Sequence, residues 1–244
     1  MKKIVANLKM NFNNEELKEY LIKLLSKNIK NKVIICPSYT SLSLANFFLK
    51  DSKIDLGAQN LCDEEEGKCT GEVSGRMLKG CGVDYVIVGH SERRTKFREN
   101  GKQINKKIKV ALKNQLKVIL CVGEQLAEKN LGRAEEVVRT QLLEAFKGLY
   151  ENELENIVIA YEPVWAIGTG KTPQNKEVEN MAKFIRKIVC EEFSPKCEKI
   201  EILYGGSIDI KNCSNFSKIK GIDGLLVGGA SLDVDNFASI AKSM

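Results

Sequence analysis

The sequence has 244 residues, of which 43% are hydrophobic and 29% charged, and this suits either one large α/β domain or two small ones. Its net charge of +6 comes from dispersed lysines without interleaved aromatic residues, which argues against a nucleic-acid partner but favours a small anionic substrate. No stretch stays uncharged long enough to cross a bilayer, so no membrane partner is expected.

Cysteine and histidine usage limits the expected metal chemistry. The eight cysteines are scattered and form no Cys-x-x-Cys pair, and the chain has one histidine, His90. We therefore predict no metal site, and we expect most cysteines to be buried free thiols in a reducing compartment. No apolar leader follows Met1, so the expected location is the cytoplasm.

Short apolar runs rich in Val and Ile recur along the whole chain, each followed by a segment that can be helical. Continuous apolar character is typical of parallel strands buried on both faces. After the first run, Asn13 and Asn14 can cap a helix with a buried stripe between Leu17 and Leu25. The predicted strands are 4–6, 33–36, 54–58, 85–88, 118–122, 157–161, 200–204 and 225–227, and the long predicted helices include 103–114, 133–149 and 177–192.

Strand and helix alternation allows two architectures. A doubly wound open sheet would carry Gly-x-Gly-x-x-Gly after its first strand, but Asn7-Leu8-Lys9 stands there instead. We therefore predict a single (β/α)8 barrel domain over residues 1–244. In such a barrel the active site lies where the strands end, which makes the residues after each run the candidates.

Polar residues follow three of these runs. Asn7 and Lys9 follow the first, and His90 follows the fourth at the start of a predicted helix, whose dipole favours a neutral imidazole. Glu162 directly follows the sixth run, where partial burial can raise its basicity. Alone, each residue has an ordinary structural alternative: a surface lysine, a structural histidine or an ion-paired carboxylate. Their meeting at one barrel mouth favours catalysis.

Glycines and a lid-like segment complete the candidate site. Gly205-Gly206-Ser207 and Gly228-Gly229 follow the last two runs, where bare backbone amides can approach an anion such as phosphate. Either pair alone could be a tight turn, but two on neighbouring strands favour an anion site. After Glu162, the apolar segment 163–170 ends in glycines and contains Trp165, the only tryptophan, which is typical of a lid over a site.

These segments together resemble the triosephosphate isomerase family. The resemblance extends along the whole chain in family order and is most specific in Gly89-His90-Ser91-Glu92-Arg93-Arg94 and in the stretch from Tyr161 to Gly170. It implies a cofactor-free isomerase of glycolysis and gluconeogenesis that interconverts dihydroxyacetone phosphate and glyceraldehyde 3-phosphate by proton transfer.

The resemblance also implies residue roles. Glu162 would be the base, His90 the electrophile, Lys9 and Asn7 would bind the substrate oxygens, and Glu92 and Cys121 would support them. The phosphate would be held by Gly168, Ser207, Gly228 and Gly229. A homodimer is expected, with Thr70 reaching the partner's site.

Departures from the family pattern and two rival functions remain. Lys68-Cys69 and Gly101-Lys102 are unusual near the expected dimer contact and leave its strength open, while Pro173 stands earlier than usual and affects hinge stiffness.

One rival is another phosphate-binding barrel isomerase, although those families lack the Tyr-Glu-Pro-Val-Trp lid. The other is a non-catalytic barrel scaffold, although such a chain is expected to have lost at least one of the four catalytic residues.

Overall fold

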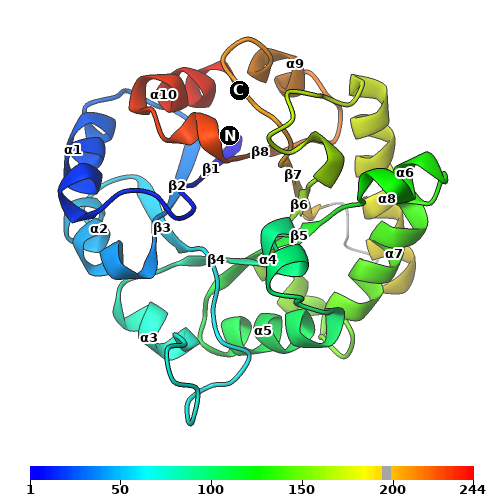
Figure 1. Cartoon of the computed structure of the whole chain (residues 1–244), viewed down its shortest axis with the longest axis horizontal. Coiled ribbons are helices and arrows are strands. Elements are labelled where there is room, and N and C mark those ends of the chain that lie inside the picture. The colour runs from blue at the N-terminus through cyan, green and yellow to red at the C-terminus, as the bar shows by residue number, and fades with distance from the viewer. Residues whose placement is uncertain (194–198) are drawn as a thin grey trace.

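The computed structural model describes residues 1–193 and 199–244, and its centre is a closed barrel of eight parallel strands (Figure 1). Each strand pairs with the next along the chain, and the barrel closes where Ile4 of the first strand pairs with Leu225 of the last. The strands are β1 (Lys3–Asn7), β2 (Lys32–Cys36), β3 (Ile54–Ala58), β4 (Tyr85–Val88), β5 (Lys117–Val122), β6 (Ile157–Tyr161), β7 (Glu201–Tyr204) and β8 (Gly224–Val227). The predicted (β/α)8 class is confirmed.

Two apolar layers hold the barrel together. Val5, Ile87 and Leu203 belong to a buried cluster separate from the larger one that contains Ile4, Val86 and Ile202. Neighbouring residues of a strand point to opposite faces of the sheet. The smaller cluster, with Val5, therefore fills the inside of the barrel, and the larger cluster, with Ile4, lies between the strands and the helices. This two-sided burial explains the uniformly apolar strand sequences.

Helices surround the barrel as an outer ring (Figure 1). They are α1 (Asn14–Leu25), α2 (Leu42–Leu49), α3 (Gly75–Gly80), α4 (Ser91–Lys96), α5 (Gly101–Lys113), α6 (Leu126–Asn130), α7 (Ala134–Ala145), α8 (Asn175–Glu192), α9 (Cys213–Ser217) and α10 (Val234–Ser243). Short 3-10 helices are η1 (Tyr39–Ser41), η2 (Glu151–Asn156), η3 (Val164–Ala166) and η5 (Gly229–Ser231).

The predicted helices exist, but some bounds differ. As predicted, Asn13 caps α1, and its side chain accepts hydrogen bonds from the backbone N–H groups of Glu15 and Glu16. The prediction of one helix over 133–149 was wrong at its end, because α7 stops at Ala145 and the chain turns at Gly148, whose φ is +70°. An Asn100 capping box starts α5 two residues before the predicted 103.

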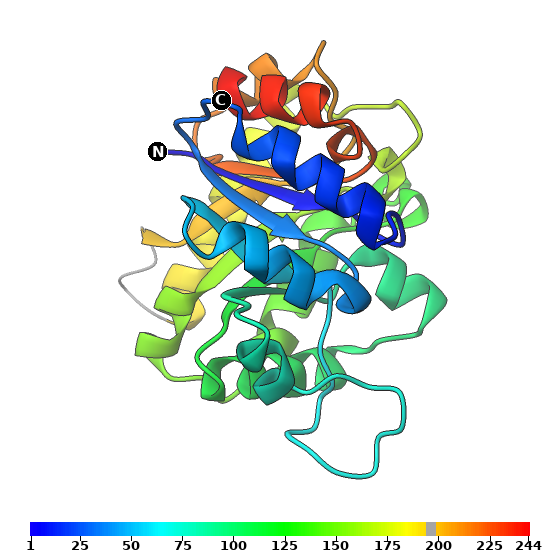
Figure 2. The ribbon, with the colours of Figure 1, turned by 90° about the vertical axis from the view of Figure 1, so that its left-hand side faces the viewer.

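One long segment projects away from the barrel. It joins β3 to α3 and is the cyan loop that extends furthest from the strands in the side view (Figure 2). Thr70 lies in this segment and is exposed. In the part of the chain that the structure describes, no helix is long and apolar enough to cross a membrane.

The prediction of buried free thiols is confirmed at four of the eight cysteines. Cys36, Cys62, Cys121 and Cys213 are buried free thiols, and Cys69 and Cys81 are half-buried free thiols. Cys190 is instead disulfide-bonded, and Cys197 lies outside the described residues.

Candidate active site

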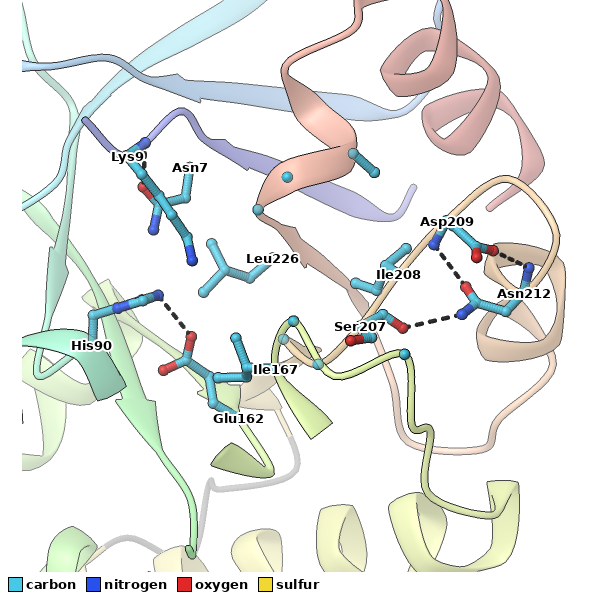
Figure 3. Close-up of a pocket in the computed structure, with 17 residues that line it drawn as sticks. Asn7, Lys9, His90, Glu162, Ile167, Ser207, Ile208, Asp209, Asn212 and Leu226 are labelled. Carbon is cyan, nitrogen blue, oxygen red and sulfur yellow. Dashed lines mark hydrogen bonds and ion pairs between the residues drawn. The ribbon is translucent and has the colours of Figure 1, made fainter. Parts of the chain in front are cut away.

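The carboxyl ends of the strands meet around one cavity of about 440 Å³ (Figure 3). Asn7 is the last residue of β1, His90 lies two residues after β4, and Glu162 directly follows β6. The loops after β7 and β8 close the other side. Every residue expected to touch substrate lines this cavity: Asn7, Lys9, His90, Glu162, Gly168, Ser207, Gly228 and Gly229.

A buried carboxylate and an imidazole in the lining of this cavity contact each other directly. Glu162 Oε1 lies 3.1 Å from His90 Nε2, and Oε2 accepts a 3.1 Å hydrogen bond from the Ser91 N–H (Figure 3 shows the first contact). The two side chains are only 3% and 8% exposed. Their positions are fixed by backbone, because the Glu162 N–H donates to the Val122 carbonyl and His90 is the N-cap residue of α4.

The hydrogen bonds of His90 fix its tautomer. The Glu92 backbone N–H lies 3.2 Å from Nδ1 and donates to it, so Nδ1 carries a lone pair and the ring proton sits on Nε2. Burial lowers the pKa of His90, but the Glu162 carboxylate outweighs burial and holds that pKa above its ordinary value. The imidazole thus presents an Nε2–H donor to the cavity.

The acidity of Glu162 differs from the expectation of raised basicity. Burial does raise its pKa, but the charge and hydrogen bond of His90, the Ser91 N–H and the Cys121 thiol outweigh burial, so the pKa lies below its ordinary value. The sequence analysis considered only burial and missed these bonds. Cys121 lies beneath Glu162, and the pKa of its thiol is raised well above normal by burial and by Glu162, so it is a neutral donor.

Lys9 is directed into the cavity by strained backbone. Its φ is +52°, a left-handed conformation that is unfavourable for a side chain with a Cβ, and its N–H donates to Asn7 Oδ1 at 3.1 Å. Lys9 Nζ lies 2.7 Å from Glu92 Oε1. Burial raises the pKa of Glu92, but Lys9, His90 and Lys96 together lower it more, so the carboxylate is ionised and holds the lysine.

The predicted anion end of the cavity consists of loops. Gly168 has φ +69°, Gly228 leaves room for the Lys9 stem, and a Cβ on Gly228 would lie 3.2 Å from Lys9 Cε. The Ser207 hydroxyl donates to the Ala166 carbonyl of the segment 163–170. The loops after β6, β7 and β8 thus meet where bare amides can face a phosphate.

Other residues of the cavity were missed by the sequence analysis. Ile167 and Leu226 line it beside Glu162, and Asp209 and Asn212 line its far end. Leu226 belongs to the apolar cluster inside the barrel. The alternation of inward and outward side chains along β8 could therefore have predicted that Leu226 points inward. Thr70 is not among the lining residues of this cavity, and no group of three His, Cys, Asp or Glu in the described ranges is arranged to hold a metal.

A closed parallel barrel whose mouth joins a carboxylate, an imidazole, a lysine and glycine-rich loops defines the class of (β/α)8-barrel enzymes that move protons on phosphorylated substrates. Sequence comparison then identifies the family. The triosephosphate isomerase profile matches residues 2–244, and the chain belongs to this family.

Named relatives agree with the family assignment over nearly their whole length. The chain is 46% identical to the triosephosphate isomerase of Dictyoglomus thermophilum, covering 98% of both chains. It is 44% identical to that of Finegoldia magna, covering 97% of this chain and 96% of the relative. It is also 44% identical to that of Geobacter metallireducens, covering 98% and 97%. The predicted family and isomerase class are confirmed.

Proposed function

We propose that this chain interconverts dihydroxyacetone phosphate and D-glyceraldehyde 3-phosphate through an enediol(ate), in glycolysis and gluconeogenesis, without a cofactor. The observation that carries the proposal is the contact between Glu162 and His90 Nε2 at 3.1 Å, inside a cavity that also contains Lys9 and the glycine loops. A base and a neutral hydrogen-bond donor on opposite sides of a small substrate are what this proton transfer requires.

The proton transfer uses groups already in place. With substrate between them, Glu162 removes a proton from the carbon next to the carbonyl and returns it to the neighbouring carbon. His90 Nε2–H, now donated to Glu162, turns to the substrate oxygens, and its fixed tautomer keeps it a donor. Lys9 adds positive charge beside the developing oxyanion, and Asn7 orients the oxygens. These roles are carried over from the family, and the distances above support them.

Substrate displaces Glu162 from its resting bonds. The carboxylate then loses the contact with His90, the largest cause that lowers its pKa, so its basicity rises when the reaction needs it. Ile167 and Leu226 supply the apolar surroundings for that step.

The phosphate is held by the amides of Gly168, Ser207, Gly228 and Gly229, and segment 163–170 closes over the intermediate. Closure excludes water and prevents elimination of phosphate from the enediolate. Gly168 and Gly170 have φ of +69° and +72°, a region that glycine adopts easily because it has no Cβ. These two residues therefore allow the segment to change its backbone conformation.

A coupled assay tests the proposal against its rivals. Purified protein is given D-glyceraldehyde 3-phosphate, and the dihydroxyacetone phosphate formed is reduced by an NADH-dependent dehydrogenase. Another phosphate-binding barrel isomerase, or a binding scaffold, gives no NADH consumption above the enzyme-free rate. A matched Glu162→Gln preparation shows that any activity belongs to this chain.

We also propose a homodimer of the single-domain chain, in which Thr70 of the loop 62–74 enters the partner. A second cavity of about 500 Å³ supports this, because it lies beside Lys9 and Glu92 and includes the exposed apolar side chains of Met10 and Phe97. An apolar hollow next to a catalytic lysine fits a loop of a second copy. Sedimentation of the unmodified chain and of Thr70→Arg tests this: a monomer in both contradicts it.

A cytoplasmic location completes the proposal. Free thiols at six described positions, four of them buried, favour a reducing compartment, where the substrate pair of glycolysis is found. Fractionation of cells that express the chain, followed by immunoblotting, tests the location.

A further inference from the structure

The start of the segment 163–170 is held by a buried carboxylate. Trp165 Nε1 donates to Glu124 Oε1 at 2.6 Å, and the Tyr161 hydroxyl donates to Glu124 Oε2 at 3.1 Å. Glu124 is 1% exposed, and its backbone carbonyl also accepts from the Val164 N–H. The indole edge of Trp165 is therefore fixed, and its face is left for another partner.

Lys129 of α6 takes that face. Its Nζ lies 3.4 Å from the centroid of the Trp165 ring, within the range of a strong cation–π contact. The same Nζ lies 3.1 Å from Glu177 Oε1 in the first turn of α8. Figure 1 shows α6 and α8 on the same side of the barrel.

Glu177 in turn fixes the chain shortly after the segment ends. Its Oε2 accepts a 2.7 Å hydrogen bond from the Gln174 N–H, closing the capping box that starts α8. The Lys129 ammonium thus contacts Trp165, near the start of segment 163–170. It also contacts Glu177, which fixes the chain just after the segment ends. Lys129 does not line the catalytic cavity, so it does not contact the substrate site directly.

We infer that Lys129 is a positioning residue that couples the two hinges of the lid, so that Trp165 and the start of α8 move together when the lid closes. The inference rests on the proposed function, because it assigns segment 163–170 as the lid. Without the ammonium, each hinge moves independently, so the lid closes less completely. Independent hinges lower turnover and let more of the enediolate lose phosphate.

Lys129→Met tests the inference by removing the charge while keeping most of the side-chain length. Expected are a fall in kcat of about 3- to 10-fold, the size of one lost cation–π contact, with little change in KM, and a larger share of phosphate released per isomerisation. Since Trp165 is the only tryptophan, its emission reports the first hinge directly, and its response to 2-phosphoglycolate should shrink. Lys129→Arg should restore all three readouts.

Lys176→Met is the matched control, because Lys176 is exposed and pairs with Glu179 rather than with Trp165. Glu177→Gln keeps an acceptor for the Gln174 N–H but loses the negative charge that contacts Lys129. It should therefore raise phosphate release, as Lys129→Met does. Combined with Lys129→Met, it should add little.

Two results overturn the inference: phosphate release and Trp165 emission in Lys129→Met that match Lys176→Met, or a Glu177→Gln variant indistinguishable from the unmodified chain. A failed proposed function looks different, because then the unmodified chain itself does not isomerise.

Discussion

Shortening Glu162 by one methylene is the sharpest test of the assigned base. Glu162→Asp withdraws the carboxylate by about 1.5 Å, the length of one C–C bond. Its present contacts are 3.1 Å to His90 Nε2 and 3.1 Å to the Ser91 N–H, so both lengthen beyond hydrogen-bond range. The same withdrawal separates the base from the substrate carbon.

The expected loss of turnover follows from that displacement. A misplacement of about 1 Å in a catalytic group can cost 10²-fold in rate, so we expect kcat to fall by about 10²-fold or more, or roughly 3 kcal/mol in the barrier. The stability cost is about 1 kcal/mol for the lost buried methylene and about 1–3 kcal/mol more for the weakened hydrogen bonds of the buried carboxylate. Because domains are typically stable by about 5–15 kcal/mol, the variant should still fold.

The measurement is kcat in the coupled assay, with thermal unfolding followed by circular dichroism on the same preparations. Glu19→Asp on the exposed face of α1 is the matched control and should leave both unchanged. A Glu162→Asp variant that is folded and retains near-normal turnover would refute Glu162 as the base.

The remaining predictions concern the lid, a buried ion cluster and pH. Deleting 166–169 should raise the ratio of inorganic phosphate released to product formed, measured by a phosphate assay beside isomerisation; an unchanged ratio contradicts the lid. Lys107→Met should lower the free energy of unfolding by about 3 kcal/mol in urea titrations, because the buried Glu99 loses one of its two cations; a loss below about 1 kcal/mol contradicts this. The pKa of Glu162 is lowered from 4.5 on folding, so its ionised form adds stability that is present above pH 4.5 and lost as pH falls through the folded pKa. The stability difference between the unmodified chain and Glu162→Gln should therefore shrink as pH falls below 4.5, with a separate change at higher pH from His90, whose pKa Glu162 raises; a difference that stays constant below pH 4.5 contradicts the shift.

The barrel was predictable because its strands are buried on both faces. Runs such as 118–122 and 157–161 must be uniformly apolar to pack inside and outside at once, and β5 and β6 occupy these residues. The end of α7 was not predictable from the same pattern, because Phe146 continues the apolar stripe and is buried although the helix has stopped. A local turn at Gly148 decided that boundary.

The membership of the site was predictable, whereas its electrostatics were not. Asn7, His90 and Glu162 stand at strand ends, so topology alone brings them to one mouth. The direction of the Glu162 pKa depends first on His90 and then on Ser91 and Cys121, whose contacts with the carboxylate appear only when the chain is folded. Lys129 was missed for a similar reason, because its partners Trp165 and Glu177 lie on other elements and no local spacing connects them.

The opposed effects of Glu162 and His90 on each other suit a reversible proton transfer. The negative charge of Glu162 is what raises the pKa of His90, so His90 is most easily protonated when Glu162 is ionised. Once Glu162 has taken the substrate proton, its negative charge has moved to the enediolate oxygens, while burial and the Glu92 N–H at Nδ1 still oppose a charged ring. In the proposed mechanism, His90 therefore stays neutral when the enediolate forms, and it stabilises the oxygens as a hydrogen-bond donor without giving up its proton to them. The same neutral donor serves both directions of the reaction, because returning the proton to either carbon restores the charge on Glu162.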